Sequence, residues 1–174
     1  MRETMKKKMT KAELSKKLSV LENTADSANY EAGSAWQQKH ALLAQQYIES
    51  YPDSTLTDDE TAALIFALNE DVQVRDYAMG LIQPNDNHAQ AWYTLMLRAP
   101  LKYRSAQACL ASNVRYEQEL RAEAIMLLTH AKETYPLAQL LKRVYAAGWE
   151  PKEFSIMRKE LHPKVKAAIF AEVN

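Results

Sequence analysis

Residues 57–68 read TDDETAALIFAL, and this stretch decides the fold more clearly than any other. Thr57 and Glu60 form the Thr-x-x-Glu pattern of a capping box, in which two side chains satisfy free backbone N–H groups at the start of a helix. The acidic residues of the first turn suit the positive end of the helix dipole. The residues after them are apolar on most sides of a helix, which predicts the buried centre of a helical protein.

The rest of the chain continues as short amphipathic segments that begin and end at caps, prolines or glycines, with no strand signal. Helices are predicted over residues 10–22, 31–50, 57–68, 71–79, 86–99, 101–112, 117–133, 136–147, 151–162 and 163–173. Connections of a few residues favour antiparallel neighbours. The prediction is an all-α fold of stacked antiparallel helical hairpins, or an irregular helical bundle, with about eight to ten helices and no sheet.

The composition excludes several classes of protein. Only three of the 174 residues are glycine, so neither a Rossmann fingerprint nor a phosphate-binding loop can be assembled. The longest apolar run, residues 62–68, is far shorter than the roughly 20 residues that span a bilayer. No apolar segment behind the first lysines resembles a secretory signal. Cys109 is the only cysteine, which fits a reducing compartment and predicts a cytoplasmic protein.

A net charge of zero conceals a segregation of charge along the chain. Residues 1–17 carry seven basic and two acidic groups, residues 18–97 two basic and twelve acidic, and residues 98–174 thirteen basic and eight acidic. Opposite segments are expected to attract within the fold or across an oligomer; the alternative is a basic surface for an acidic partner. We divide the chain into a basic N-terminal arm with a short helix, residues 1–28, and one helical domain, residues 29–174.

Two resemblances bear on the family. Asp86–Leu95 is similar to a tetratricopeptide segment, but the 34-residue period of that repeat does not continue. Residues 56–76, Trp92, Ala99-Pro100, residues 135–141 and residues 146–148 resemble, in this order, the C-terminal helical half of an actinobacterial protein family of unknown function. The resemblance covers about residues 55–160 and implies a helical fold and a bacterial cytoplasmic origin, without an activity or site residues.

No catalytic, cofactor-binding or metal-binding residues are predicted. His40, His88, His130 and His162 include no i, i+4 pair of the kind that binds zinc. Cys109 lies between Ala108 and Leu110 on a predicted helix, where it reads as a packed side chain. The carboxylates of residues 58–60, 117 and 119 lie at or near predicted helix starts, which explains them without catalysis.

Three hypotheses for function follow. The leading one is a non-enzymatic protein–protein interaction module, with self-association as one form of that interaction. The alternative is a nucleic-acid-associated protein, because basic and aromatic residues can contact phosphates and stack on bases. The residues proposed for contact with a protein partner or a nucleic acid are Lys6, Lys7, Lys8, Arg98, Lys102, Tyr103, Arg104 and Arg115. The third hypothesis is an enzyme whose site converges only in the fold.

Overall fold

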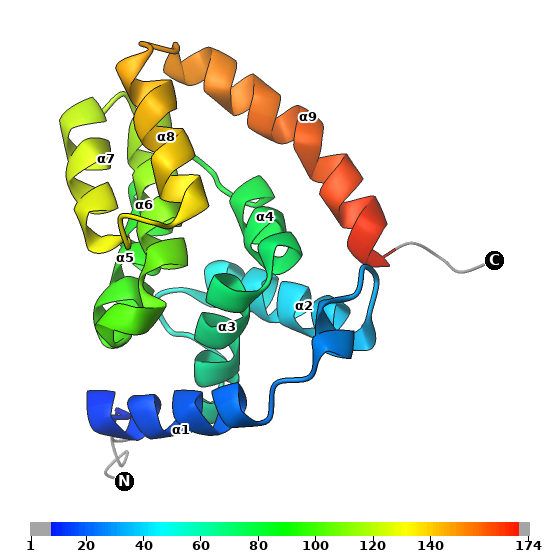
Figure 1. The fold of residues 1–174 in the computed structure, drawn as a ribbon. Coiled ribbons are helices and arrows are strands. Elements are labelled where there is room, and N and C mark those ends of the chain that lie inside the picture. Colours follow the sequence, from blue (N-terminus) through cyan, green and yellow to red (C-terminus); the bar gives the residue numbers. More distant parts are fainter. Residues whose placement is uncertain (1–7, 171–174) are drawn as a thin grey trace, which may run out of the picture.

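The computed structural model describes residues 8–170, and the described chain consists of helices joined by short turns, without a strand (Figure 1). Between residues 8 and 170, nine α-helices and three short 3-10 segments follow one another. The α-helices are α1 (Lys11–Asn23), α2 (Ala35–Ser50), α3 (Asp58–Glu70), α4 (Val72–Gly80), α5 (Asp86–Arg98), α6 (Ser105–Glu117), α7 (Arg121–Leu127), α8 (Pro136–Ala146) and α9 (Pro151–Phe170). The 3-10 segments are η1 (Ser27–Tyr30), η2 (Leu101–Tyr103) and η3 (Leu128–His130). The predicted all-α class is confirmed.

The predicted capping box is present at the start of α3. The Glu60 N–H donates to Thr57 Oγ1 at 3.1 Å, and the Thr57 N–H donates to Glu60 Oε1 at 3.0 Å. The predicted Thr10 cap is also present, since its hydroxyl accepts from the Glu13 N–H at 3.1 Å. Each bond satisfies a helix N–H that has no partner within its own helix.

One predicted helix start is wrong by a few residues. The helix predicted from residue 31 begins at Ala35, because Gly33 adopts a φ of 78° and Ser34 supplies the cap. The helix predicted from residue 86 does begin at Asp86, and its cap is Asn85, whose side chain accepts from the His88 N–H at 2.9 Å. At both starts the polar side chain directly before the helix supplies the cap.

The helices predicted over residues 101–112 and 117–133 are wrong in their boundaries. The first is interrupted at Arg104, and α6 then continues to Glu117. There Glu119 takes a left-handed φ of 65°, while the Leu120 N–H donates to the Arg115 carbonyl at 2.9 Å and the Glu119 N–H to Tyr116 at 3.0 Å. This is a Schellman helix end, which glycine usually supplies. A glutamate in that place gives no signal in the sequence.

The two helices predicted from Pro151 and Pro163 are a single helix, α9. Pro163 lies inside it and removes one backbone hydrogen bond, the one that the Lys159 carbonyl would accept. Both residues are exposed, so water can satisfy that carbonyl. Pro136 begins α8, as predicted.

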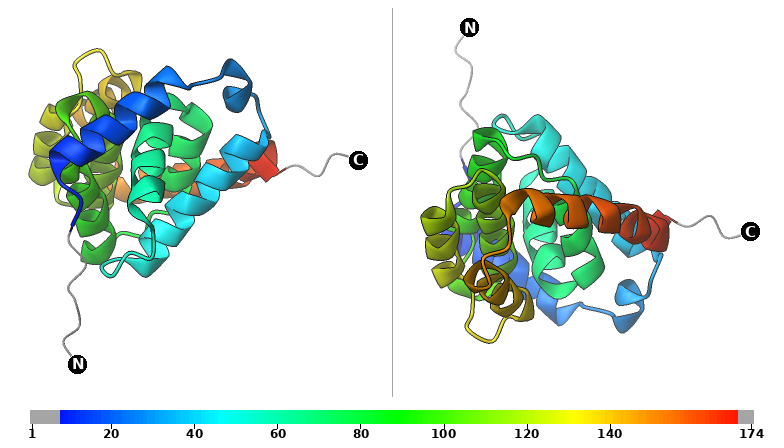
Figure 2. Two further views of the ribbon diagram at one scale, coloured as in Figure 1. Left: turned by 90° about the horizontal axis from the view of Figure 1, so that it is seen from below. Right: turned by 90° about the horizontal axis from the view of Figure 1, so that it is seen from above.

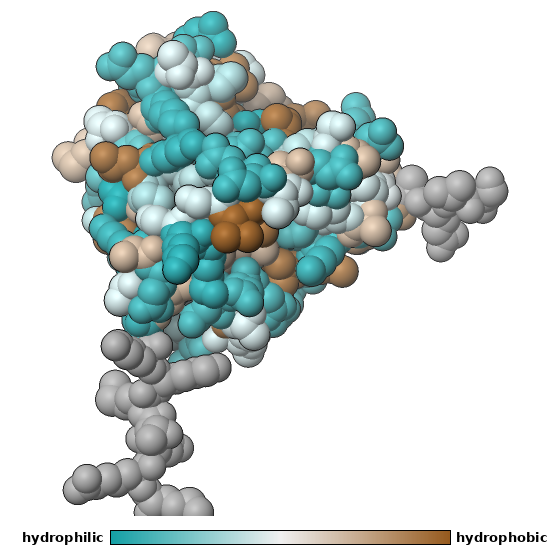
Figure 3. Space-filling model, turned by 60° about the horizontal axis from the view of Figure 1, so that its bottom comes forward, coloured by the Kyte–Doolittle hydropathy of each residue, from teal (hydrophilic) through white to brown (hydrophobic). Residues whose placement is uncertain are grey.

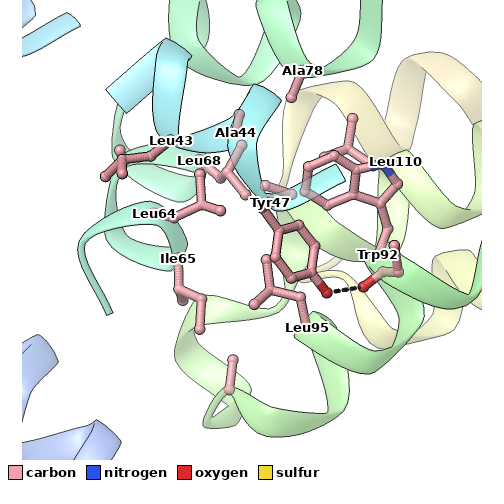
Figure 4. Packing of buried hydrophobic residues seen from close by; sticks show 14 of the residues in the cluster. Leu43, Ala44, Tyr47, Leu64, Ile65, Leu68, Ala78, Trp92, Leu95 and Leu110 are labelled. Carbon is pink, nitrogen blue, oxygen red and sulfur yellow. Dashed lines mark hydrogen bonds between the residues drawn. The ribbon is translucent and has the colours of Figure 1, made fainter. Parts of the chain in front are cut away.

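The hydrophobic core is centred on α3, as its sequence predicted. Residues Leu64 to Leu68 are all at most 5% exposed. Figure 4 shows Leu64, Ile65 and Leu68 facing Tyr47 from α2 and Trp92 and Leu95 from α5. The Tyr47 hydroxyl donates to the Ala91 carbonyl inside this cluster, so the one polar atom of this side chain is satisfied.

The first and last helices cross opposite sides of this core. Seen from below, α1 lies across α3, where it buries Leu14 and Leu18 (Figure 2, left). Seen from above, α9 runs along α4 toward α2 (Figure 2, right). At its far end the Gln38 Nε2 amide donates to the Ile169 carbonyl at 3.1 Å, which joins α9 to α2.

The segregated charges meet within the fold. Lys17 contacts Asp59 at 2.5 Å, Lys102 contacts Glu22 at 2.6 Å, and Arg115 contacts Asp86 at 2.8 Å. Each pair joins a basic flank of the sequence to its acidic middle. The attraction within the fold that the sequence analysis expected is therefore present.

Gly80 and His162 provide a test of how α9 packs on α4. A Cβ added at Gly80 would lie 1.8 Å from His162 Nδ1, so Gly80→Ala should lower the free energy of unfolding by about 1–3 kcal/mol through overpacking. In a His162→Ala background the same change should be neutral or gain about 0.5–1 kcal/mol, because alanine favours a helix over glycine. Urea unfolding of the four proteins measures both effects. An equal effect of Gly80→Ala in the two backgrounds would contradict this packing.

Candidate functional site

A groove with a volume of about 510 Å³ opens between α4, α8 and α9. Two walls of the groove are apolar. The α8 wall consists of Leu137, Leu140, Leu141 and Val144. The α9 wall consists of Phe154, Met157, Leu161 and Val165. Met79 and Gly80 from α4 also line the groove, and Trp149 contributes from the turn between α8 and α9.

The walls follow from the spacing of apolar residues in the two helices. In α8 these residues recur at i, i+3, i+4 and i+7, which places them on one face. The side chains deepest in the groove are buried, with Leu141 at 1% exposure and Phe154 at 4%. Those at its mouth are not, since Leu140 is 48%, Leu161 49% and Trp149 41% exposed. The groove therefore presents apolar surface to solvent on both walls.

A buried ion pair holds the α9 wall in place. The Arg158 guanidinium donates through Nε and NH2 to the two Glu117 carboxylate oxygens at 2.7 and 2.8 Å. The two side chains are only 3% and 1% exposed. The remaining guanidinium nitrogen of Arg158, Nη1, donates to the Met79 and Gly80 carbonyls at 3.2 and 3.3 Å. Arg158 thus connects α9 to α6 and to the end of α4.

His162 lies one turn further along α9 and also lines the groove. Its Nδ1 atom is buried and has no hydrogen-bond partner among the described residues. Burial lowers the pKa of His162, and the nearby cations Lys166 and Arg158 lower it further. The lowered pKa favours the neutral imidazole, whose unpartnered Nδ1 atom packs against Gly80 of α4.

Two further charged groups stand at the groove, and they differ in their partners. Arg75 is tied to Asp76 at 2.9 Å and to the Tyr135 hydroxyl at 3.3 Å, with its guanidinium 5.7 Å from the centre of the Tyr135 ring. Lys164 is exposed and forms no ion pair within residues 8–170. The free charge of the groove is therefore positive.

The described lining is poor in side chains that act as nucleophiles. It holds no serine, threonine, cysteine or tyrosine among its described residues, and its one carboxylate, Asp76, is occupied by Arg75. Cys109 is buried outside the lining, and burial raises the pKa of its thiol to about 12, so the thiolate nucleophile is suppressed. Between residues 8 and 170, no three histidine, cysteine, aspartate or glutamate side chains form a group that could hold a metal ion.

The residues predicted to contact a partner lie elsewhere. Lys6 and Lys7 fall outside the described residues, and Lys8 is exposed just before α1. Lys102 and Tyr103 converge on Glu22, at 2.6 and 2.9 Å from its carboxylate oxygens. Neither of them lines the groove.

The predicted arginines are also separated from the groove. Arg104 donates to the Ala99 carbonyl at 2.6 Å and Arg98 is half-buried in the last turn of α5. Arg115, near the opposite end of α6, bonds Asp86 at 2.8 Å and contacts Glu123 at 3.4 Å. The structure brings Lys102 and Tyr103 together on Glu22, just before α6 begins. Arg115 lies apart from them, in the last turn of α6.

Sequence reasoning missed the groove and the residues Glu117, Arg158, His162 and Lys164. One signal pointed to Arg158, which falls on the predicted apolar stripe of Phe154, Met157 and Leu161. A cation on an apolar stripe requires a buried partner. That partner, Glu117, lies 41 residues earlier in the sequence. A predicted helix start already explains Glu117 in the sequence, and the spacing of residues does not connect it with Arg158.

Comparison with known proteins identifies a family. The family described as Domain of unknown function (DUF4192) matches residues 2–152. Because this match spans most of the chain, the protein belongs to that family. The expected membership of an uncharacterised family is thus confirmed. No curated protein and no solved structure matches the chain.

The Arg158–Glu117 pair makes a direct test of how the site is held. Arg158→Met leaves a buried carboxylate uncompensated and should cost about 3–5 kcal/mol of unfolding free energy. Replacing both partners, as Arg158→Met with Glu117→Leu, should recover most of that loss. Urea unfolding followed by circular dichroism measures the changes.

Arg143→Met is the matched control, because Arg143 is exposed on α8 and has no ion-pair partner among the described residues. Its effect should stay within about 0.5 kcal/mol. A loss below about 1 kcal/mol for Arg158→Met would show that the pair does not hold α9.

Proposed function

We propose that this member of a family of unknown function is a protein–protein interaction module that binds an amphipathic helix of another protein in the groove between α8 and α9. The observation that carries the proposal is the apolar surface exposed on both walls, at Leu140, Trp149 and Leu161. Helix-in-groove recognition uses such a surface, into which the partner inserts apolar residues spaced at i, i+3, i+4 and i+7.

The contrast with other surfaces supports this choice. On the face that carries α1, hydrophobic residues form small separate spots among hydrophilic ones (Figure 3). Single exposed apolar residues are normal on a protein surface, whereas contiguous apolar surface marks interaction sites. The groove is the contiguous case, since its two walls and its floor are apolar along α8, α9 and the end of α4.

The two alternative functions have less support. Nucleic-acid binding through Lys102, Arg104 and Arg115 would have to compete with the contacts that these side chains already make inside the protein. A catalytic role would need an activated nucleophile or a general base. The described lining holds no hydroxyl or thiol nucleophile, and His162 is the one side chain in it that could act as a base. We therefore retain the interaction module as the leading function.

The proposal assumes a bacterial cytoplasm as the setting. A buried cysteine thiol is compatible with a reducing compartment. None of the described helices is long and apolar enough to cross a membrane. The partner is accordingly taken to be a protein that meets the groove in that compartment.

Selection of helical peptides tests the groove directly. Peptides of about 16 residues, long enough for four helical turns, are selected by display on the wild-type protein. The selected peptides should share apolar residues at i, i+3, i+4 and i+7, and Leu161→Glu should weaken their binding at least about tenfold, because a carboxylate would be desolvated against the peptide. Fluorescence anisotropy measures the dissociation constants.

Ile125→Glu is the matched control for this test. Ile125 is 47% exposed on α7, close to the 49% of Leu161, and does not line the groove. Peptides that bind Leu161→Glu and Ile125→Glu equally well would place the binding surface elsewhere. Failure of the wild-type protein to enrich any helical peptide would also refute the proposal.

A further inference from the structure

The helices that form the groove carry an excess of positive charge without internal partners. Together α8 and α9 contain seven basic and two acidic residues. Of the seven, only Arg158 forms an ion pair with another described residue. The six cations left are Lys142, Arg143, Lys152, Lys159, Lys164 and Lys166.

Three cations elsewhere in the protein are neutralised by the acidic middle of the chain. Lys17, Lys102 and Arg115 each contact a carboxylate from residues 18–97. Within the described chain no carboxylate does the same for Lys164, which lines the groove. The groove therefore combines apolar walls with one lining cation, Lys164, that no carboxylate of residues 8–170 neutralises.

We infer that the helix bound in the groove carries aspartate or glutamate residues that flank its apolar stripe. This inference rests on the proposed function and adds the charge of the partner to it. The apolar stripe of the partner covers Leu140 and Leu161, while a flanking carboxylate meets Lys164 at the edge of the same groove. Because this lysine is exposed, the attraction is screened as the salt concentration rises.

A second copy of this chain is a less suitable partner, because its exposed apolar stripe on α5 and η2 is not flanked by acidic residues in the sequence. Tyr93, Leu97 and Leu101 are exposed at spacings of four residues along α5 and η2. Their neighbours in sequence include Arg98 and Lys102, so the stripe is flanked by positive charge and would meet the cations of α8 and α9. The charges favour a different, acidic protein.

Phosphates of a nucleic acid would neutralise the cations of α8 and α9, but they would not cover the apolar walls of the groove. Phosphate contacts to lysine need no hydrophobic groove, and the lining offers one tryptophan and one phenylalanine, of which Phe154 is buried. An amphipathic acidic helix accounts for both properties at once. It is therefore the partner that the observations favour.

Three leucine-striped helical peptides of about 16 residues test the inference, with glutamate, glutamine or lysine in their flanking positions. Fluorescence anisotropy at 50 and 200 mM salt should show the glutamate peptide binding at least about tenfold tighter than the lysine peptide at the lower salt concentration. That preference should shrink at 200 mM. Lys164→Glu should weaken the glutamate peptide several-fold and strengthen the lysine peptide, whereas Lys16→Glu on α1 should change neither.

The possible outcomes separate the two proposals. Equal binding of all three peptides in the groove would overturn the acidic partner and leave the interaction groove standing. No binding of any peptide would count against the groove itself. If a DNA duplex displaces the glutamate peptide and loses affinity on Lys164→Glu, the cations serve nucleic acid and the inference is wrong.

Discussion

The buried ion pair between Arg158 and Glu117 is the constraint on which the functional surface depends. Of the 20 residues of α9, the buried ones are Phe154 and Ile169, near its ends, and Arg158 between them. A long helix would ordinarily be held by a continuous apolar stripe. Here Arg158 holds the middle through a bidentate contact to α6 and two carbonyls of α4. The groove can therefore be lined by Met157, Leu161 and Val165. This arrangement requires two buried charges, although packed apolar residues in their place could give equal or greater stability.

This arrangement connects the fold to the proposed function. The core around α3 is closed by α1, α2, α4, α5 and α6 without a contribution from α8. The C-terminal helices α8 and α9 instead belong to a second hydrophobic cluster, to which α8 contributes Tyr145 and α9 contributes Phe154. Part of the apolar surface of this second cluster remains open in the groove. Their cations are also left unpaired within the described chain, except Arg158. One part of the molecule therefore provides stability, and another provides both the hydrophobic surface and the charge with which a partner can be recognised.

Local signals predicted much of the fold and little of the site. The Thr57 capping box, the Pro136 start and the buried α3 depend on residues close in sequence, and they were predicted correctly. The Schellman turn at Glu119 was not, because a glutamate replaces the glycine that marks such turns. The sequence predicts a helix start at Pro163, whereas the exposed Lys159 carbonyl makes a proline tolerable inside α9. The groove depends on contacts such as Glu117–Arg158 and Gly80–His162, which join residues 41 and 82 positions apart, and no local pattern reports them.

Hydrogen exchange of the backbone amides, compared between the wild-type protein and Glu117→Gln, tests the central claim most directly. The substitution removes one charge of the pair while keeping the shape of the side chain. If the pair holds α9 in place, amides of residues 155–170 should exchange at least about tenfold faster in the variant, while those of residues 61–68 in α3 keep their protection, because α9 then opens as a unit of its own. Unchanged exchange in α9, or an equal loss of protection in α3, would contradict the account.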